Sequence, residues 1–381
     1  MDGTERAVLL IAESCNNADM YHAIRFLFSD PVIYLRHHGR ELLVCSNFER
    51  EEAQRHSRVA EVADFEAFGY TKLLKQFPKR YEAFAALVLQ LLHDRSVGSV
   101  IVTSAAPVDV VDYLRAQGIE VICDPEALLG ARIAKRDDEI VAMEVAQRAT
   151  ERAMRRAIDL VGASEVRDGQ LLLEGQPLTA EHLRAAIDGS FLADNCLADG
   201  TIAACGPLAA GPHYRGAGLL HPNQTIILDI FPRHKEHRYF ADMTRTISKG
   251  DPGPELRRMY DTTLRAQEAA LALIRPGISG REVYEAVCSI YEDADYPTTL
   301  RTGGAYPATG FIHSLGHGLG LEVHERPNMG RQDETLEVGH VVTVEPGLYD
   351  PKIGAVRIED MVVVTEHGCR NLTQFEKRLI V

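Results

Sequence analysis

Three histidines and two acidic residues lie near alternating glycines in the segment HSLGHGLGLEVHE, residues 313–325. His313 and His317 are four positions apart, a spacing that would place two metal ligands on one turn of a helix. The glycines argue against a helix, because each costs a helix interior about 1 kcal/mol relative to alanine. Alternating glycine instead predicts an extended segment whose backbone is closely approached. A histidine held there could meet a metal or a substrate, although a glycine-rich surface loop would have the same composition.

Acidic residues interrupt four apolar stretches that otherwise have the composition of buried strands. The stretches are TIILDIF (225–231), FADMTRTI (240–247), HVVTVE (340–345) and AVRIEDMVVV (355–364). The acids in question are Asp229, Asp242, Glu345 and Glu359. Each of them alone could cap a strand or face solvent at a turn. Acids are rarely fully buried without a partner, however, so several such cases predict one shared partner.

A pair of metal ions is the partner that suits this charge. Four converging carboxylates would carry about four negative charges, and their mutual repulsion would raise their pKa values. Divalent cations would cancel that charge. Carboxylates with one imidazole suit Mn²⁺, with Co²⁺ and Zn²⁺ feasible. Two cations about 3.5–4 Å apart form a known hydrolytic arrangement. We therefore expect a hydrolase with two divalent cations, and we favour Mn²⁺.

The elements that must position these residues fall into two blocks. Strand-like and helix-like stretches alternate through the first third of the chain, which predicts an α/β domain with some parallel pairing. In the second block, helices and mostly antiparallel strands occur in separate groups, which predicts an α+β domain. Its expected helices are 137–161, 254–274 and 280–293. We expect an N-terminal domain of residues 1–130 and a C-terminal domain of residues 131–381.

With these motifs, the chain resembles the pita-bread metallopeptidases of the M24 type, which include aminopeptidase P, prolidase and the methionine aminopeptidases. The family's ligands follow the order Asp, Asp, His, Glu, Glu, and the matching residues are Asp229, Asp242, His317, Glu345 and Glu359. The resemblance covers roughly residues 130–381. It implies a pita-bread fold for the C-terminal domain. The α/β region resembles the non-catalytic, creatinase-type domain of the Xaa-Pro aminopeptidase and prolidase branch.

The resemblance also implies a role for each ligand. Asp242 and Glu359 would bridge the two cations, and Asp229 would chelate one of them. His317 and Glu345 would complete the site of the other cation. Glu345 would serve in addition as the general base that handles the proton of the attacking water.

Five further side chains take roles from the same resemblance. Those expected to contact the substrate or its oxyanion, or to line the pocket, are His213, His313 and His324. Those expected to orient the ligands are Tyr349 and Arg357. Each has an ordinary alternative, such as a loop histidine, a core aromatic or an arginine paired with a surface acid.

Three features depart from the family's pattern. The gap of 13 positions from Asp229 to Asp242 is a little longer than usual. Phe231 and Pro232 replace the usual glycine after the first ligand strand, and Leu208 stands where asparagine is common. The charged segment RHKEHRY is expected to be an exposed hairpin loop, in which His234 and His237 are solvated rather than ligands.

The branch implies an enzyme that hydrolyses the N-terminal Xaa-Pro bond of dipeptides or short peptides, by attack of a hydroxide that bridges the two metals. It also implies a peptide substrate with proline in second position, and homodimers are common in it. A metal-independent, creatinase-like amidinohydrolase and a non-catalytic protein of the same fold are the alternatives. The intact ligand set disfavours both.

Composition excludes several other classes of function. The 381 residues carry a net charge of −14, with 45% hydrophobic and 25% charged residues. This acidity disfavours nucleic acid as a partner, because nucleic-acid binding depends on cationic contacts to phosphates. Seven scattered cysteines without a CxxC pair do not form a disulfide framework. Without a signal peptide or an apolar run long enough to span a membrane, we expect a cytoplasmic protein.

Overall fold

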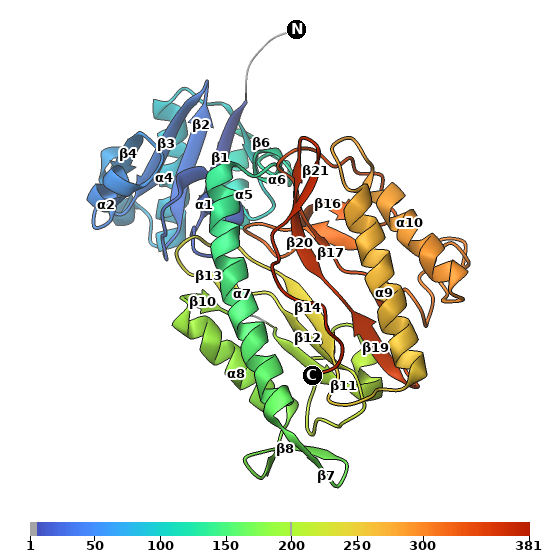
Figure 1. Cartoon of the computed structure of the whole chain (residues 1–381). Helices are drawn as coiled ribbons and strands as arrows, with labels where there is room; N and C mark the ends of the chain where they lie inside the picture. The colour runs from blue at the N-terminus through green and yellow to red at the C-terminus, as the bar shows by residue number, and fades with distance from the viewer. Residues whose placement is uncertain (1–5, 199) are drawn as a thin grey trace. The chain divides into compact units, whose positions relative to one another are not determined.

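The computed structural model describes residues 6–198 and 200–381, shown in Figure 1. The chain divides into two compact units, with the boundary between Arg132 and Ile133. Within the described residues, none of the helices combines the length and the apolar character that crossing a bilayer requires.

The first unit is built on one mixed sheet with the strand order β4-β3-β2-β1-β5-β6. The strands are β1 (Ala7–Ala12), β2 (Val32–His37), β3 (Arg40–Cys45), β4 (Glu61–Asp64), β5 (Ser99–Val102) and β6 (Glu120–Cys123). The helices are α1 (Ala18–Ile24), α2 (Arg50–His56), α3 (Tyr70–Gln76), α4 (Arg80–Asp94), α5 (Val108–Ala116) and, at the boundary, α6 (Gly130–Ile133). β1, β5 and β6 are parallel, whereas β1, β2 and β3 are antiparallel. The expected α/β unit with partial parallel pairing is confirmed.

Helices cover both faces of this sheet because its central strand is buried on both faces. Leu9 and Ile11 of β1 pack into the cluster formed with α4 and α5, while Val8 and Leu10 pack into the cluster formed with α1 and α2. Successive residues of a strand point to opposite faces, so one apolar run supplies two cores.

The second unit is an α+β unit whose named strands all pair antiparallel. Its first half contains α7 (Asp137–Ala163), β7 (Glu165–Arg167), β8 (Gln170–Leu173), β9 (Gln176–Pro177), α8 (Ala180–Ala193), β10 (Cys196–Leu197), β11 (Ile202–Cys205), β12 (Ile226–Ile230), β13 (Arg233–His234) and β14 (Met243–Ile247). Its second half contains α9 (Pro254–Leu273), α10 (Gly280–Asp293), β15 (Gly316–Gly318), β16 (Glu325–Met329), β17 (Val341–Val344), β18 (Gly347–Asp350), β19 (Gly354–Arg357), β20 (Asp360–Thr365) and β21 (Gly368–Asn371).

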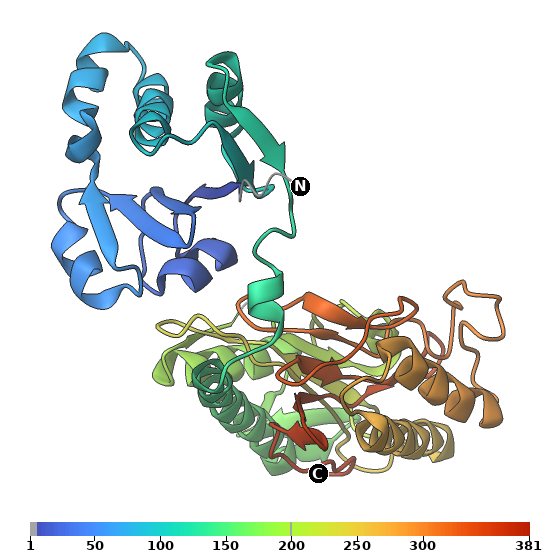
Figure 2. The same cartoon turned by 90° about the horizontal axis from the view of Figure 1, so that it is seen from above.

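Each half of this unit pairs two helices with a sheet. α7 and α8 pack together beside the sheet β11-β12-β14, and α9 and α10 pack together beside the sheet β16-β15-β17-β20-β21. The long helices α7 and α9 lie on the same side of the strands in both views of the unit (Figures 1 and 2). The opposite faces of the two sheets are therefore left for other side chains.

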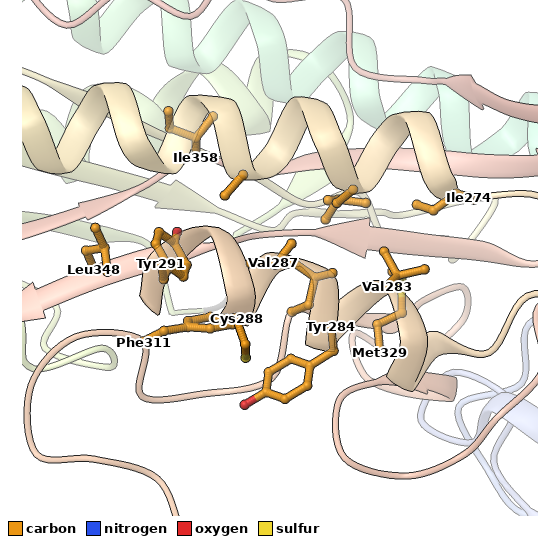
Figure 3. Close-up of a cluster of buried hydrophobic side chains, with 14 of the residues drawn as sticks. Ile274, Val283, Tyr284, Val287, Cys288, Tyr291, Phe311, Met329, Leu348 and Ile358 are labelled. Carbon is orange, nitrogen blue, oxygen red and sulfur yellow. The ribbon is translucent and has the colours of Figure 1, made fainter. Parts of the chain in front are cut away.

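A hydrophobic core packs α9 and α10 against the strands of the second half. Tyr284, Tyr291 and Phe311 cluster with Leu348 and Ile358, as Figure 3 shows, and all five side chains are buried. Leu348 and Ile358 directly precede Tyr349 and Glu359 in the chain, and Phe311 lies two positions before His313. Because neighbouring residues of an extended chain point in opposite directions, packing of these core residues directs Tyr349 and Glu359 away from the core.

The stretch 355–364 is not the single strand expected from its apolar pattern. β19 pairs with β18, whereas β20 pairs with β17 and β21, so the chain changes sheets between Arg357 and Asp360. The backbone N–H of Glu359 donates to the carbonyl oxygen of Thr244 on β14, 3.1 Å away. The break in the pattern thus places Glu359 where the sheets of the two halves meet.

Candidate metal centre

The first two acids lie on one face of the β12–β14 ladder. Asp229 is directly opposite Thr244 in this antiparallel pair. Asp242 immediately precedes β14 and stands two positions before Thr244, so the two side chains share a face. On the other face, Leu228 and Ile230 are fully buried in the core under α7 and α8. That burial determines which way the acids point.

The glycine-rich segment is extended, as predicted, and it is closely approached. β15 spans Gly316–Gly318 with His317 at its centre. A Cβ on Gly316 would lie 2.1 Å from the carbonyl oxygen of Thr343, and one on Gly318 would lie 2.3 Å from that of Arg326. A side chain at either glycine would therefore push β15 away from its neighbours.

His317 presents one bare ring nitrogen to the acids. Its Nδ1 lies 3.0 Å from the carbonyl oxygen of Gly318, which can only accept, so Nδ1 carries the hydrogen. Its Nε2 lies 3.4 Å from Oε1 of Glu345 and 3.8 Å from Oδ2 of Asp242. Burial lowers the pKa of His317 to about 4, with the nearby His324 adding to the effect. The imidazole is therefore neutral, which is the form that binds a metal.

Asp242, His317 and Glu359 each offer a ligand atom, and these atoms lie within 4.8 Å of one another. Oδ1 of Asp242 is buried and has no hydrogen-bond partner among the residues that the structure describes. Burial raises the pKa of Asp242, and the charges of Asp229 and Glu345 raise it further. The pKa of Glu359 is raised in the same way, by burial and then by Asp242 and Glu345. A buried carboxylate oxygen without a partner is what an aspartate ligand leaves when its cation is absent.

Glu345 completes the group at the end of β17. Burial raises its pKa to about 8; Arg357 opposes the shift and Asp229 adds to it. The hydroxyl of Thr343, which accepts the backbone N–H of His317, donates to Oε1 of Glu345 at 3.3 Å. A carboxyl group with a pKa near neutrality has the property that a general acid or base needs.

Arg357 connects three parts of the site. Its Nη2 pairs with Oδ2 of Asp229, and its Nη1 donates to the hydroxyl oxygen of Tyr349 at 2.7 Å. Its Nε donates to Oγ1 of Thr244 at 3.3 Å, and the Thr244 hydroxyl donates in turn to Oε2 of Glu359 at 2.7 Å. Burial opposes the charge of Arg357, but Tyr349 and the nearby acids outweigh it and raise its pKa. Arg357 thus pairs directly with Asp229, and its charge also acts on Asp242 and Glu345.

His313, Tyr349 and Arg357 are linked by a chain of hydrogen bonds. Nδ1 of His313 lies 2.7 Å from the carbonyl oxygen of Ser314, so its Nε2 accepts from the Tyr349 hydroxyl at 2.9 Å. Burial lowers the pKa of His313 to about 3, with Arg357 contributing, and the ring stays neutral. Both ring nitrogens are engaged, so in this arrangement His313 orients Tyr349.

The two remaining histidines, His213 and His324, are both exposed to solvent. The ring of His324 packs edge-on to the ring of His317, with 4.4 Å between centroids. Burial and His213 lower the pKa of His324, while Asp229 raises it. His213 is itself exposed and acts on the pKa values of both His313 and His324. The sequence-predicted residues are therefore brought together in one region.

Two hydroxyls at the site had no role in the sequence reasoning. Thr244 orients Glu359, and Thr343 orients Glu345. A signal for both was present, because each threonine stands two positions along a strand from an acid and so shares that acid's face. The pattern alone does not say whether such a hydroxyl reaches the carboxylate.

The segment RHKEHRY is not the exposed loop that its charge suggested. β13 pairs with β10, and the hydroxyl of Tyr239 donates to Oε1 of the buried Glu139 at 2.6 Å. His234 is buried and stacks on the exposed His237, with 4.6 Å between ring centroids. The expectation of solvation was therefore wrong for His234 and right for His237. The reason is that a tyrosine bonded to a buried glutamate ties the segment down.

Comparison with known proteins places the second unit in a family context. The sequence profile of metallopeptidase family M24 matches residues 141–366. An Xaa-Pro dipeptidase from Pyrococcus furiosus is 38% identical over 182 residues, or 47% of this chain and 49% of that protein. The chain thus spans about half the length of this curated relative.

Solved structures match almost the whole chain. The prolidase from Pyrococcus horikoshii OT3 superposes with a TM-score of 0.76 at 26% identity, covering 98% of this chain and 95% of that one. The X-Pro aminopeptidase from Thermotoga maritima MSB8 superposes with a TM-score of 0.80 at 24% identity, covering 99% and 97%. The second likeness is one of fold alone, and together these matches confirm the expected pita-bread architecture.

Proposed function

The chain belongs to metallopeptidase family M24, and from this membership we propose that it is a two-metal hydrolase that cleaves the Xaa-Pro bond of a dipeptide or short peptide. The proposed substrate follows the printed activity of its relatives, an Xaa-Pro dipeptidase and a prolidase. Mn²⁺ as the native cation, a homodimeric state and a cytoplasmic location stay predictions.

The unpartnered Oδ1 of Asp242 is the observation that carries the two-metal assignment. The side chains that would hold the cations are Asp229, Asp242, His317, Glu345 and Glu359. Their charge fits two divalent ions, since within residues 6–198 and 200–381 the arginine paired with this group is Arg357, at Asp229. Such ions, when bound, lower the pKa of a coordinated water and stabilise negative charge on the substrate carbonyl oxygen. A creatinase-like reaction without metal would not explain why these five potential ligands lie together.

The protein's own groups would manage the protons of the reaction. Glu345 would take a proton from the attacking water and pass it to the leaving proline nitrogen, held in place by the hydroxyl of Thr343. His324 and His213, which are exposed, would donate hydrogen bonds to the peptide carbonyl. His313 would act through Tyr349, because its ring nitrogens are already engaged.

An assay on matched peptides tests the proposal. Protein stripped with a chelator is reloaded with Mn²⁺, Co²⁺ or Zn²⁺ and offered Xaa-Pro dipeptides, Xaa-Pro tripeptides and the same peptides with alanine in place of proline. We expect metal-dependent release of the first residue from the proline peptides only. Glu345→Ala should abolish turnover, whereas Glu366→Ala, at an exposed glutamate beyond β20, should not. Turnover in the presence of chelator would overturn the mechanism, and equal cleavage of the alanine peptides would overturn the substrate.

A further inference from the structure

A buried ion pair lies beside the site and has no part in the proposed chemistry. Nζ of Lys135 donates to Oε2 of Glu325 at 2.9 Å, across 190 residues of sequence. Their side chains are only 2% and 1% exposed. An ion pair buried to this degree is costly to desolvate, so its presence calls for a reason other than stability.

Glu325 closes the turn that carries His324. Its Oε1 accepts the backbone N–H groups of Leu321 and Glu322 at 3.1 and 3.2 Å, while its Oε2 faces Lys135. Both carboxylate oxygens are therefore committed. Residues 319–324 connect β15 to β16, and Glu325 is the first residue of β16, so these contacts close the turn 321–325.

The pair is packed against the glycine-rich segment with no spare room. A Cβ on Gly320 would lie 2.8 Å from Oε2 of Glu325 and 2.9 Å from Cε of Lys135. A Cβ on Gly318 would meet the carbonyl oxygen of Glu325 at 2.9 Å. The lack of a side chain at Gly320 thus leaves room for the ion pair. At Gly316 and Gly318 it leaves room for the neighbouring backbone.

Lys135 reaches this turn from a backbone that is itself held in place. Its N–H donates to the carbonyl oxygen of Gly339 at 2.8 Å, and Ala134 forms a bridge with His340, directly before β17. The backbone of Lys135 is therefore fixed to the residues that lead into β17, the strand that Glu345 follows.

We propose that Lys135 and Glu325 are positioning residues, whose ion pair holds the turn 321–325 and so sets His324 against His317 and in front of the metal ligands. The ring contact between His324 and His317 is the geometry that the pair would preserve. The inference rests on the proposed function in one respect, because it takes His324 as the group that meets the substrate carbonyl.

Backbone exchange tests the pair without any substrate. Hydrogen exchange at the amides of Leu321 and Glu322, which donate to Glu325, is compared in the metal-loaded wild type, Lys135→Met and the doubly neutral Lys135→Met/Glu325→Gln. We expect exchange there to rise about 10-fold or more in the single variant and to be largely restored in the double variant. The double variant removes both charges of this pair, so it also guards against a single variant that does not fold. Arg132→Met, which breaks the Arg132–Asp19 pair of the first unit, should leave these amides unchanged.

Kinetics test the link to His324. Lys135→Met should lower kcat and kcat/KM together, by about 100-fold, as expected for a misplaced catalytic group. In the His324→Ala background the same substitution should have almost no further effect, because its target is gone. A metal titration should give an unchanged stoichiometry, since the ligands lie on other elements.

The two readouts separate the possible failures. Exchange that rises evenly over the second unit, or only together with metal loss, would overturn the positioning role in favour of a merely structural one. Full additivity of Lys135→Met and His324→Ala would overturn the link to His324. If the wild type cleaves no peptide, the proposed function fails, but the exchange result still decides whether the pair holds the turn.

Discussion

Glu359 and Asp360 are adjacent acids, both buried, and they have opposite surroundings. Asp360 accepts from Nη2 of Arg245 at 2.8 Å and from Nζ of Lys377 at 2.7 Å. Burial alone would raise its pKa, but Arg245 and Lys377 outweigh burial and lower it. Glu359 accepts from a threonine hydroxyl and faces other carboxylates, and its pKa is raised.

The contrast distinguishes a structural charge from a functional one. On the Asp360 face the protein supplies its own cations, so the burial of that carboxylate is compensated within the fold. On the Glu359 face, among the described residues, Arg357 pairs with one of the four carboxylates, Asp229, and the remaining negative charge is left for cations from solution. Compensation on one face and its absence on the other indicate that the uncompensated face is a binding site.

Replacing a site acid should give the largest effect of all. Asp242→Asn should lower kcat/KM by at least about 1,000-fold, because the removed ligand stabilises the transition state by several kcal/mol through the metal. The metal-free protein should be as stable as the wild type or more stable, since one repelling charge is gone. Metal content by mass spectrometry, peptide kinetics and urea unfolding check these outcomes. The exposed Asp261→Asn is the control, and full metal content with near-normal turnover would contradict the expectation.

Breaking the compensated face should instead destabilise the fold. Arg245→Met leaves the buried Asp360 with one cation fewer and removes donors to the carbonyl oxygens of Thr244 and Glu359. We expect a loss of about 3–5 kcal/mol in the free energy of unfolding, measured with denaturant. Arg257→Met, at the exposed pair with Asp251, should have a much smaller effect, because solvent screens that pair. Equal effects of the two substitutions would remove the distinction between the faces.

The pH dependence of stability should have opposite signs on the two faces. The folded metal-free protein holds the Glu345 proton more tightly than the unfolded chain does, because its pKa is raised from 4.5 to about 8. Its stability should therefore fall as pH rises through that range, by up to about 1.4 kcal/mol per pH unit. For Asp360, whose pKa is lowered, the stabilisation is present above 3.8 and is lost as pH falls.

Urea unfolding of the metal-free protein from about pH 2 to about pH 8 measures both slopes. Glu345→Gln should flatten the neutral part of the profile, and Asp360→Asn should flatten the acidic part. A Glu345→Gln profile parallel to that of the wild type would show that Glu345 does not hold its proton into the neutral range.

The smallest effect is expected for the hydrogen bonds that link His313, Tyr349 and Arg357. Tyr349→Phe removes the acceptor of Arg357 and the donor to His313, which should cost about 1 kcal/mol of stability. We expect kcat/KM to fall about 10-fold, because Arg357 and through it Asp229 lose one restraint. Thermal unfolding and peptide kinetics are the measurements, with the half-exposed Tyr81→Phe as control. No change in kinetics would mean that Asp229 and Thr244 suffice to orient Arg357.

Local patterns predicted many elements closely. β1 coincides with the apolar run Ala7–Ala12, and α10 has both predicted ends, with Ser279 and Glu282 forming the expected capping box. α8 was missed, although Thr179 caps it. The residue three positions later is His182, whose Nδ1 accepts the Thr179 N–H in place of the usual glutamate. A rule based on residue type did not detect a histidine in that place.

A long apolar run predicted strands less reliably where the chain passes from one sheet to another. The run from Ala355 to Val364 has one hydrophobic pattern but belongs to two sheets, because Ile358 packs into the core under α9 and α10 while Glu359 is bound to β14. Nothing in the run itself marks that change. The candidate ligands were named from the sequence, but the pairing of Asp229 with Arg357 and the roles of Thr244 and Thr343 depend on contacts over many residues.

The sequence by itself determined the chemistry that is possible here. It shows which strands carry acids, which segment is rich in glycine, and which family the pattern resembles. Residue type and periodicity are local properties, and they can be read without coordinates. Only the tertiary structure decided which acids are compensated. A carboxylate's charge is settled by the cations within a few ångströms, and those come from distant segments: Arg245 and Lys377 for Asp360, and Arg357 for Asp229.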